Sequence, residues 1–101
     1  MNKLIAVALL MVYGSVHAVI TQEQVDAWAA QRSKYALHRA VYDGDERRVG
    51  ALLSIRSSYA FTRDPFDQLP LDVAFSCYEA TRDELMRTRY GRILVILSPK
   101  A

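Results

Sequence analysis

The chain has 101 residues, 51% of them apolar and 24% charged, and its 13 basic and 11 acidic side chains give a formal net charge of +2. A chain of this length forms one small domain at most, with little volume for a core. The nearly balanced charge argues against a protein that nucleic acid or an anionic membrane attracts through a strong overall field.

The N-terminus has the pattern of a secretory signal peptide. Lys3 precedes an apolar run at 4–13, and the next five residues end in small side chains, with Val16 and Ala18 at the positions that a signal peptidase reads. A helix of this run rises about 15 Å, half of a hydrocarbon core, so we expect no permanent membrane span. The sequence predicts cleavage after Ala18, a mature domain at 19–101 and a periplasmic or secreted location. The alternative is a buried first helix.

The first helix predicted in the mature domain covers residues 22–32. Thr21 and Gln24 form a capping box, in which the hydroxyl accepts from the amide of Gln24 and the Gln24 side chain reaches back. Three apolar side chains lie three and four residues apart, on one face of this helix: Val25, Trp28 and Ala29.

A helix–turn–helix unit is predicted next, with helices at 34–42 and 46–55. Ser33 can cap the first helix and Asp45 the second. Asp43-Gly44 separates them, because glycine tolerates the left-handed conformation that ends helices. Helical spacing predicts which side chains face inward: Leu37, Ala40 and Val41 in the first helix, and Val49, Leu52 and Leu53 in the second.

The second half of the chain begins with residues 56–70, which lack a helical period and predict a long loop or a short hairpin. Pro70 suits the first turn of a helix at 71–79, with Leu71, Ala74 and Phe75 on its apolar side. A last helix is predicted at 81–98, although its run 93–97 is also typical of a buried strand. Its inward side chains are predicted to be Leu85, Met86, Tyr90, Ile93, Leu94 and Leu97.

Two of the predicted helices begin with one pattern, at an interval of 34 residues: Ala36-Leu37-His38-Arg39-Ala40 and Pro70-Leu71-Asp72-Val73-Ala74. A period of this length is typical of solenoid proteins. The first pattern resembles the T-P-L-H-x-A element of the ankyrin repeat family, and Val49, Leu52 and Leu53 fall where that family has V-x-x-L-L. Asp64 resembles the acid of the family's finger turn, and Asp67 stands where glycine is usual. The resemblance covers residues 34–79.

The resemblance implies an all-α fold, a short solenoid of about two helical hairpins with capping helices at both ends. Such hairpins stack because neither can bury its own apolar stripe. Arg56 departs from the family pattern, because it occupies a glycine position where a positive φ would cost about 1 kcal/mol. Tyr78 replaces the glycine between the helices of the second unit, and one residue is inserted in the intervening loop. We therefore expect the C-terminal helices to differ in length from the family pattern.

The resemblance also implies a function, the binding of another protein. The family projects a finger loop beside a concave face of inner helices, and residues 56–68 occupy that place. Side chains of types enriched in binding hot spots lie there: Tyr59, Phe61, Arg63 and Phe66. We expect this surface to extend to the end of the first inner helix, at Arg39, Tyr42 and Asp43. For Tyr59 and Phe61 the alternative is packing against neighbouring repeats.

No pattern predicts an enzyme, a cofactor or a metal. His38 lacks the sequence context of a catalytic nucleophile's partner, and the resemblance implies that it ties the loop to the helix by hydrogen bonds. Residues 43–46 lack the remaining ligands of a calcium loop, so a helix break and a cap explain them better. One histidine remains after cleavage, and no zinc-ligand set is visible. Arg82, Arg87, Arg89 and Arg92 are interleaved with Asp83 and Glu84 on a helix that must show a polar side, which indicates a solvated face rather than a nucleic-acid site.

Export, small size and the lack of catalytic residues favour an inhibitor or immunity protein in the periplasm, which covers the active site of a toxic or hydrolytic enzyme. One alternative is a structural subunit of a homo- or hetero-oligomeric envelope complex, completed through an exposed last helix. A less favoured alternative is a small enzyme or redox protein that uses His38, Asp72 and Cys77. Cys77 is the only cysteine, and we expect it to be a buried apolar side chain rather than half of an intermolecular disulfide.

Overall fold

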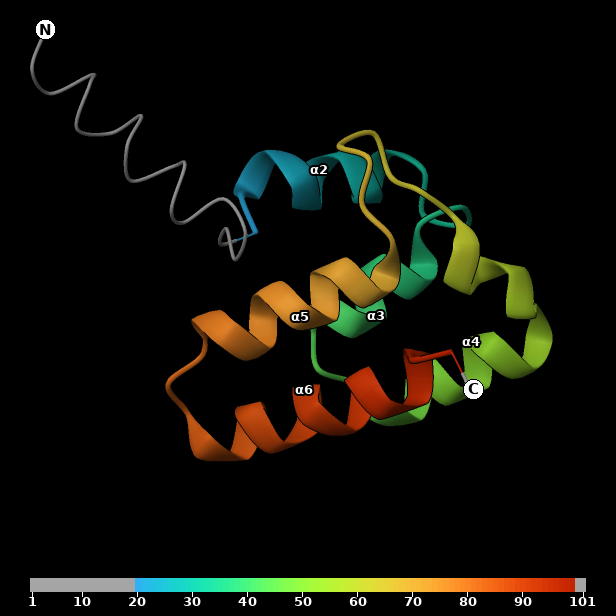
Figure 1. Cartoon of the computed structure of the whole chain (residues 1–101). Coiled ribbons are helices and arrows are strands. Elements are labelled where there is room, and N and C mark those ends of the chain that lie inside the picture. Colours follow the sequence, from blue (N-terminus) through green and yellow to red (C-terminus); the bar gives the residue numbers. More distant parts are fainter. Residues whose placement is uncertain (1–19, 100–101) are drawn as a thin grey trace, which may run out of the picture.

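The computed structural model describes residues 20–99, and this part of the chain is helical without any strand (Figure 1). Its elements are α2 (Gln22–Ala30), α3 (Ala36–Tyr42), α4 (Glu46–Ile55), the short 3-10 helix η2 (Ser57–Phe61), α5 (Pro70–Ala80) and α6 (Glu84–Leu97). The predicted all-α class is confirmed. The β-hairpin considered for 56–70 is wrong, because η2 and a loop occupy this segment, and the strand considered for 93–97 is wrong, because this run lies in α6. The predicted signal peptide and its cleavage site lie outside the described residues.

The helices form two hairpins that pack against each other. Within the hairpins α3 contacts α4 and α5 contacts α6, and between them α3 contacts α5 and α4 contacts α6. Figure 1 shows α3 and α5 in the middle of the molecule, α4 and α6 below them, and α2 with the loop before α5 above them. The two segments that repeat at an interval of 34 residues therefore begin the two central helices, which lie next to each other.

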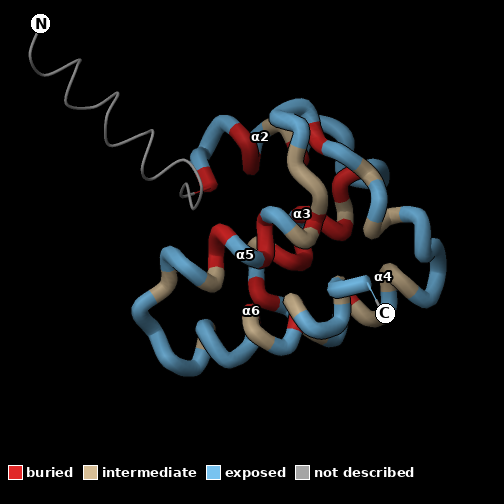
Figure 2. The backbone as a smooth tube through the Cα atoms, in the orientation of Figure 1, coloured by how far each residue is buried: buried red, intermediate tan, exposed pale blue. Residues whose placement is uncertain are grey.

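The core lies where the two hairpins meet, as the buried segments in Figure 2 show. Seven apolar side chains are completely buried: Leu37, Ala40, Val41, Val49, Val73, Ala74 and Ile93. Burial of such a Leu, Ile or Val side chain stabilises the fold by about 1.5–3 kcal/mol relative to an exposed one. Leu37, Ala40, Val41 and Val49 were predicted from helical spacing and are confirmed, while Leu52 and Leu53 are half-buried against this core.

Three side chains that helical spacing places in the core lie at the surface instead. Ala29 is exposed near the end of α2, Phe75 is exposed on α5, and Leu85 is exposed in the first turn of α6. The core face of α5 runs through Val73, Ala74, Ser76 and Cys77, because α5 packs against α3 on one side and against α6 on the other. Successive residues of an α-helix lie 100° apart around its axis. A buried face that is assigned one residue too early or too late along the sequence therefore exchanges buried and exposed side chains.

Several predicted helix ends are confirmed by their hydrogen bonds. The Thr21 hydroxyl accepts from the Gln24 amide at 3.2 Å, and the Gln24 side chain accepts from the Thr21 amide at 2.9 Å. Asp45 accepts from the Arg48 amide at 3.1 Å and caps α4. Gly44 ends the α3 segment with a φ of +69°. Each cap pairs a backbone group that the helix itself leaves unpaired.

Ser33 is not the cap of α3, and this prediction is wrong. Residues 31–34 form a turn, the helix begins at Ala36, and Tyr35 occupies the cap position without a side-chain hydrogen bond. The Tyr35 ring is buried edge-on against His38, with ring centroids 5.5 Å apart. Burial of this ring therefore outweighs the local preference for a serine cap.

The C-terminal hairpin is the longer of the two. Helices α5 and α6 have 11 and 14 residues, against 7 in α3 and 10 in α4. Tyr78 lies inside α5, because no glycine stops the helix at the place that Gly44 occupies in the first hairpin. Arg56 has a φ of −152°, an extended conformation, so the cost of a positive φ does not arise there.

Gly44 and Gly50 provide a matched pair of stability predictions. A Cβ at Gly44 would lie 2.6 Å from Cε of Met86, in addition to the positive φ, so Gly44→Ala should lower the free energy of unfolding by about 1.5 kcal/mol. Gly50 lies within α4, and apart from its chain neighbours and the backbone of that helix no atom of residues 20–99 lies within 4 Å of an added Cβ. Gly50→Ala should therefore raise the free energy of unfolding by about 0.5–1 kcal/mol. Urea unfolding measures both free energies. Equal changes for the two variants would contradict the left-handed turn at Gly44.

Candidate functional site

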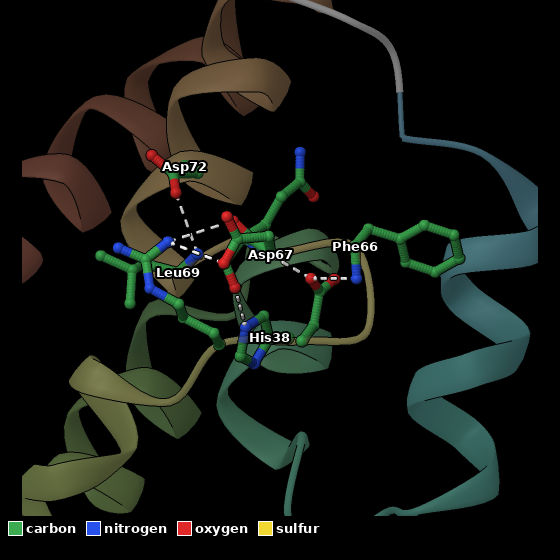
Figure 3. A network of polar contacts seen from close by, with 8 residues as sticks. His38, Phe66, Asp67, Leu69 and Asp72 are labelled. Carbon is green, nitrogen blue, oxygen red and sulfur yellow. Dashed lines mark hydrogen bonds and ion pairs between the residues drawn. The ribbon is translucent and has the colours of Figure 1, made fainter.

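The loop between η2 and α5 is organised by one buried carboxylate, that of Asp64. Its Oδ1 accepts from the amides of Phe66 at 3.0 Å and Gln68 at 2.8 Å. The Asp64 amide donates to the Gln68 carbonyl, and the Asp67 amide donates to the Asp64 carbonyl, both at 2.9 Å. These bonds close a tight turn in which Asp67 adopts a φ of 62° (Figure 3). The turn therefore has a defined shape rather than the freedom of a long loop.

Three side chains attach this turn to the helices α2 and α3. The Trp28 indole N–H donates to Oδ2 of Asp64 at 2.9 Å, and the Gln24 side-chain amide donates to Oε1 of Gln68 at 2.7 Å. From α3, His38 Nε2 lies 2.9 Å from the Gln68 carbonyl oxygen. The hydrogen bond expected between His38 and the loop is thus present, and two bonds from α2 supplement it.

His38 is held in its neutral form by this environment. Because a carbonyl only accepts, Nε2 must carry the proton, and the buried Nδ1 has no hydrogen-bond partner among residues 20–99. Burial lowers the pKa of His38, and this effect outweighs the hydrogen bond to Gln68 and the charges of Asp64 and Asp72, which act in the opposite direction. A completely buried neutral imidazole between Trp28 and Tyr35 is suited to a structural role.

The four loop residues predicted to bind a partner differ in exposure. Tyr59 is half-buried against the core, with the Arg56 guanidinium 5.6 Å from its ring centroid, so packing accounts for it. Phe61 and Phe66 are exposed, and in Figure 3 the Phe66 ring points away from His38 and the other labelled side chains. Arg63 donates to a carboxylate oxygen and to the carbonyl of Asp67, both at 3.2 Å. Residues 56–68 therefore present two apolar rings, Phe61 at the end of η2 and Phe66 in the turn, and one paired arginine.

The other three predicted residues lie in the second half of α3 and at its C-cap, which is Asp43. Arg39 and Asp43 form an ion pair with 3.1 Å between Nε and Oδ1. Tyr42 is half-buried and meets the Trp28 ring edge-on, with centroids 5.8 Å apart, while the Arg39 guanidinium lies 6.0 Å from the Tyr42 ring centroid. Trp28 thus contacts both parts of the predicted binding site. It packs on Tyr42 at the end of α3, and it donates a hydrogen bond to Asp64 in the loop before α5.

Arg39 and Asp43 line a pocket of about 310 Å³ between α2, α3 and the start of α4. The other lining residues are Trp28, Ala29, Arg32, Tyr35, Ala36 and Arg48. None of the four predicted residues in segment 56–68 lines it. The predicted site therefore divides into this pocket and a separate loop surface, which consists of Tyr59, Phe61, Arg63 and Phe66. Sequence patterns did not identify Arg32 and Arg48, because the pocket forms only when three separate segments pack together. The Arg39–Asp43 spacing of four residues was the one local signal.

Cys77 has the properties of a buried structural thiol. Burial raises the pKa of Cys77 to about 11, so the reactive thiolate is scarce at neutral pH. Nearby, the Tyr90 hydroxyl donates to the Tyr42 carbonyl at 2.7 Å and joins α6 to α3. This environment disfavours the redox alternative, which requires an accessible thiolate.

Comparisons with protein-family models, curated sequences and solved structures give no significant match. Within residues 20–99, no helix has both the length and the apolar character needed to cross a membrane. The same part of the chain contains no group of three or more His, Cys, Asp or Glu side chains arranged to hold a metal ion. The function is therefore inferred from the loop surface and the pocket.

Proposed function

We propose that this chain is an exported protein-binding domain of the ankyrin-repeat type, with a signal peptide at 1–18 and a mature domain at 19–101. Two packed hairpins whose first helices begin 34 residues apart support this proposal. Two details of the loop support it further: Asp67 has a positive φ where the family has glycine, and His38 is hydrogen-bonded to the Gln68 carbonyl.

The observation that carries the binding function is a fixed turn with exposed aromatic rings on it and beside it. Phe66 is 40% exposed in the turn that Asp64 and three helix side chains hold in place, and Phe61 is 78% exposed at the end of η2, shortly before that turn. A surface that is already ordered loses less conformational entropy on binding, so more of the contact energy appears as affinity. Large aromatic side chains are also the residues that most often dominate binding energy.

The sharper form of the proposal is a periplasmic inhibitor or immunity protein. Its mechanism is steric: the loop surface and the exposed end of α3 cover the active site of a secreted toxin or an envelope hydrolase. The signal-peptide pattern supplies the location. A small domain that needs no chemistry of its own is sufficient for this mechanism.

Partner capture tests this function. The immobilised chain should retain a protein from the envelope extract of its source. The double variant Phe61→Ala/Phe66→Ala should bind that protein at least about 30-fold more weakly, because one aromatic hot spot alone contributes roughly 2 kcal/mol. Ile55→Ala is the matched control, since Ile55 is 77% exposed but lies at the end of α4, outside the loop. Capture of no protein, or equal capture by the double variant, would contradict the proposal.

The alternative of an oligomeric envelope subunit is favoured by one observation on α6. Val95 and Ile96 are exposed on this helix, although both are large apolar side chains. An oligomer through α6 would scatter light as a multiple of 11.5 kDa or of the processed mass, and Val95→Glu would return it to a monomer. A monomer at high concentration would remove this alternative.

A further inference from the structure

We propose that the pocket between α2, α3 and the start of α4 binds the carboxylate side chain of an acidic segment on the partner. This inference rests on the protein-binding function above and adds the chemistry that the pocket recognises. It depends on the arginines that surround the pocket, on its buried floor and on the position of Asp43.

The pocket has an excess of positive charge. Arg32, Arg39 and Arg48 line it together with a single carboxylate, that of Asp43. Asp43 pairs with Arg39 at 3.1 Å, whereas the guanidinium groups of Arg32 and Arg48 form no hydrogen bond or ion pair with any residue of 20–99. Two guanidinium groups are thus available, and the planar guanidinium matches the two oxygens of a carboxylate.

The floor of the pocket is apolar and fixed. Trp28 and Tyr35 are both buried, and Ala29 and Ala36 add small side chains. The hydrogen bond to Asp64 holds the Trp28 indole, and the contact with His38 holds the Tyr35 ring. A glutamate or aspartate side chain has an apolar stem and a charged end, so the stem can lie on this floor while the carboxylate meets the arginines.

A second hollow, of about 500 Å³, lies beside this pocket but lacks its charge excess. It is lined by Asp43, Gly44, Asp45, Glu46, Arg47, Arg89 and Arg92, in which three acids balance three arginines. Arg92 also pairs with Glu46 at 3.3 Å. Of these two hollows, the pocket of Arg32 and Arg48 is therefore the one with the positive charge that attracts an anion.

The apolar floor, rather than the charges, favours a carboxylate side chain over a phosphate ion as the occupant. Asp43 lines the pocket beside Arg39 and offsets part of the charge of the three arginines. An anion with two charges is repelled more strongly by Asp43 and attracted more strongly by the arginines in the same proportion, so Asp43 does not separate the two anions. A glutamate or aspartate side chain has an apolar stem that can lie on Trp28 and Tyr35, which inorganic phosphate lacks.

Fluorescence anisotropy with a labelled hexaglutamate peptide tests the inference on the chain expressed from residues 1–101. We expect Arg32→Gln and Arg48→Gln each to weaken binding about fivefold, equivalent to about 1 kcal/mol per partly exposed ion pair. Asp43→Asn removes the repelling charge and frees Arg39, so it should strengthen binding at least about twofold. Arg82→Gln makes the same change of charge in the loop before α6 and should leave binding unaltered.

Several outcomes would overturn the inference. The first is that hexaglutamate and hexaglutamine bind equally well. The second is that the Arg32→Gln/Arg48→Gln variant binds hexaglutamate as tightly as the wild type does. The third is that inorganic phosphate, in competition, binds more tightly than the peptide. Circular dichroism verifies that each variant is folded. If the double arginine variant still captures the partner with unchanged affinity, the inference fails and the protein-binding function stands. If hexaglutamate binds as expected but no partner is captured, the proposed function fails and the anion pocket stands.

Discussion

Replacing Asp64 with alanine should lower the free energy of unfolding by about 3 kcal/mol, one of the two largest effects that we expect from a single substitution. Three N–H donors lose their acceptor at once: the Trp28 indole and the amides of Phe66 and Gln68. Asp64 is 5% exposed, so water cannot readily replace the lost oxygens. Urea unfolding followed by circular dichroism measures the change.

Asp64→Asn separates the contribution of Trp28 from that of the turn. The amide oxygen of asparagine can still accept from Phe66 and Gln68, but its NH₂ group then faces the Trp28 N–H, and neither can accept. We expect a loss of about 2 kcal/mol when Trp28 is present and about 1 kcal/mol in a Trp28→Phe background, a coupling of about 1 kcal/mol.

Asp72→Asn is the matched control for this cycle. Asp72 also accepts from a backbone amide, that of Leu69 at 2.9 Å, but it is exposed at the start of α5 and has no tryptophan partner. Its replacement should cost less than about 1 kcal/mol in either background. If the losses in free energy of unfolding from Asp64→Asn and Trp28→Phe are strictly additive in the double variant, the hydrogen bond between these two side chains does not hold the loop to α2.

Sequence reasoning was accurate where a structure depends on neighbours in the chain. The Thr21–Gln24 capping box, the Asp45 cap and the left-handed Gly44 each involve groups no more than three residues apart. Pro70 opens α5 for the same kind of reason, because its fixed φ suits a first turn. Asp64 was identified through resemblance, and the side chain is indeed the acceptor that closes the turn.

Sequence reasoning failed where a position depends on segments that are distant in the chain. Helical spacing alone cannot tell which of two adjacent faces the neighbouring helices cover, so Phe75 and Leu85 were placed in the core. Ser33 was expected to cap a helix, but the burial of Tyr35 against His38 decided where that helix begins. The same limit explains the pocket, since Arg32 and Arg48 meet only after α2, α3 and α4 have packed.

Stability should fall as the pH is lowered from 7.5 to 5, because of His38. Burial lowers the pKa of His38 below its ordinary value of about 6.5, so the unfolded chain binds a proton more readily than the folded one. The contribution of His38 is therefore fully present above pH 6.5 and is lost as the pH falls toward the folded pKa. Between pH 6.5 and the folded pKa, the free energy of unfolding should decline by at most about 1.4 kcal/mol per pH unit.

The structural cause is the arrangement around the two ring nitrogens. Nε2 donates to the Gln68 carbonyl, and a second proton would have to sit on Nδ1, which is buried without an acceptor. Asp64 and Asp72 attract a positive charge on the ring and raise the pKa, but desolvation is the larger effect. Protonation leaves Nε2–H able to donate to Gln68, but it places a charge and an unpaired Nδ1–H in the core, so it should favour unfolding.

His38→Gln provides the test that isolates this residue, because its amide nitrogen can still donate to Gln68 while the side chain cannot titrate. The variant loses ring contacts with Trp28 and Tyr35, so it should be less stable by about 2 kcal/mol at pH 7.5. Its free energy of unfolding should then be nearly constant between pH 7.5 and 5, where the wild type declines. His17 is the only other histidine and is unchanged in the variant, so a decline that persists in His38→Gln would assign the pH dependence to other groups.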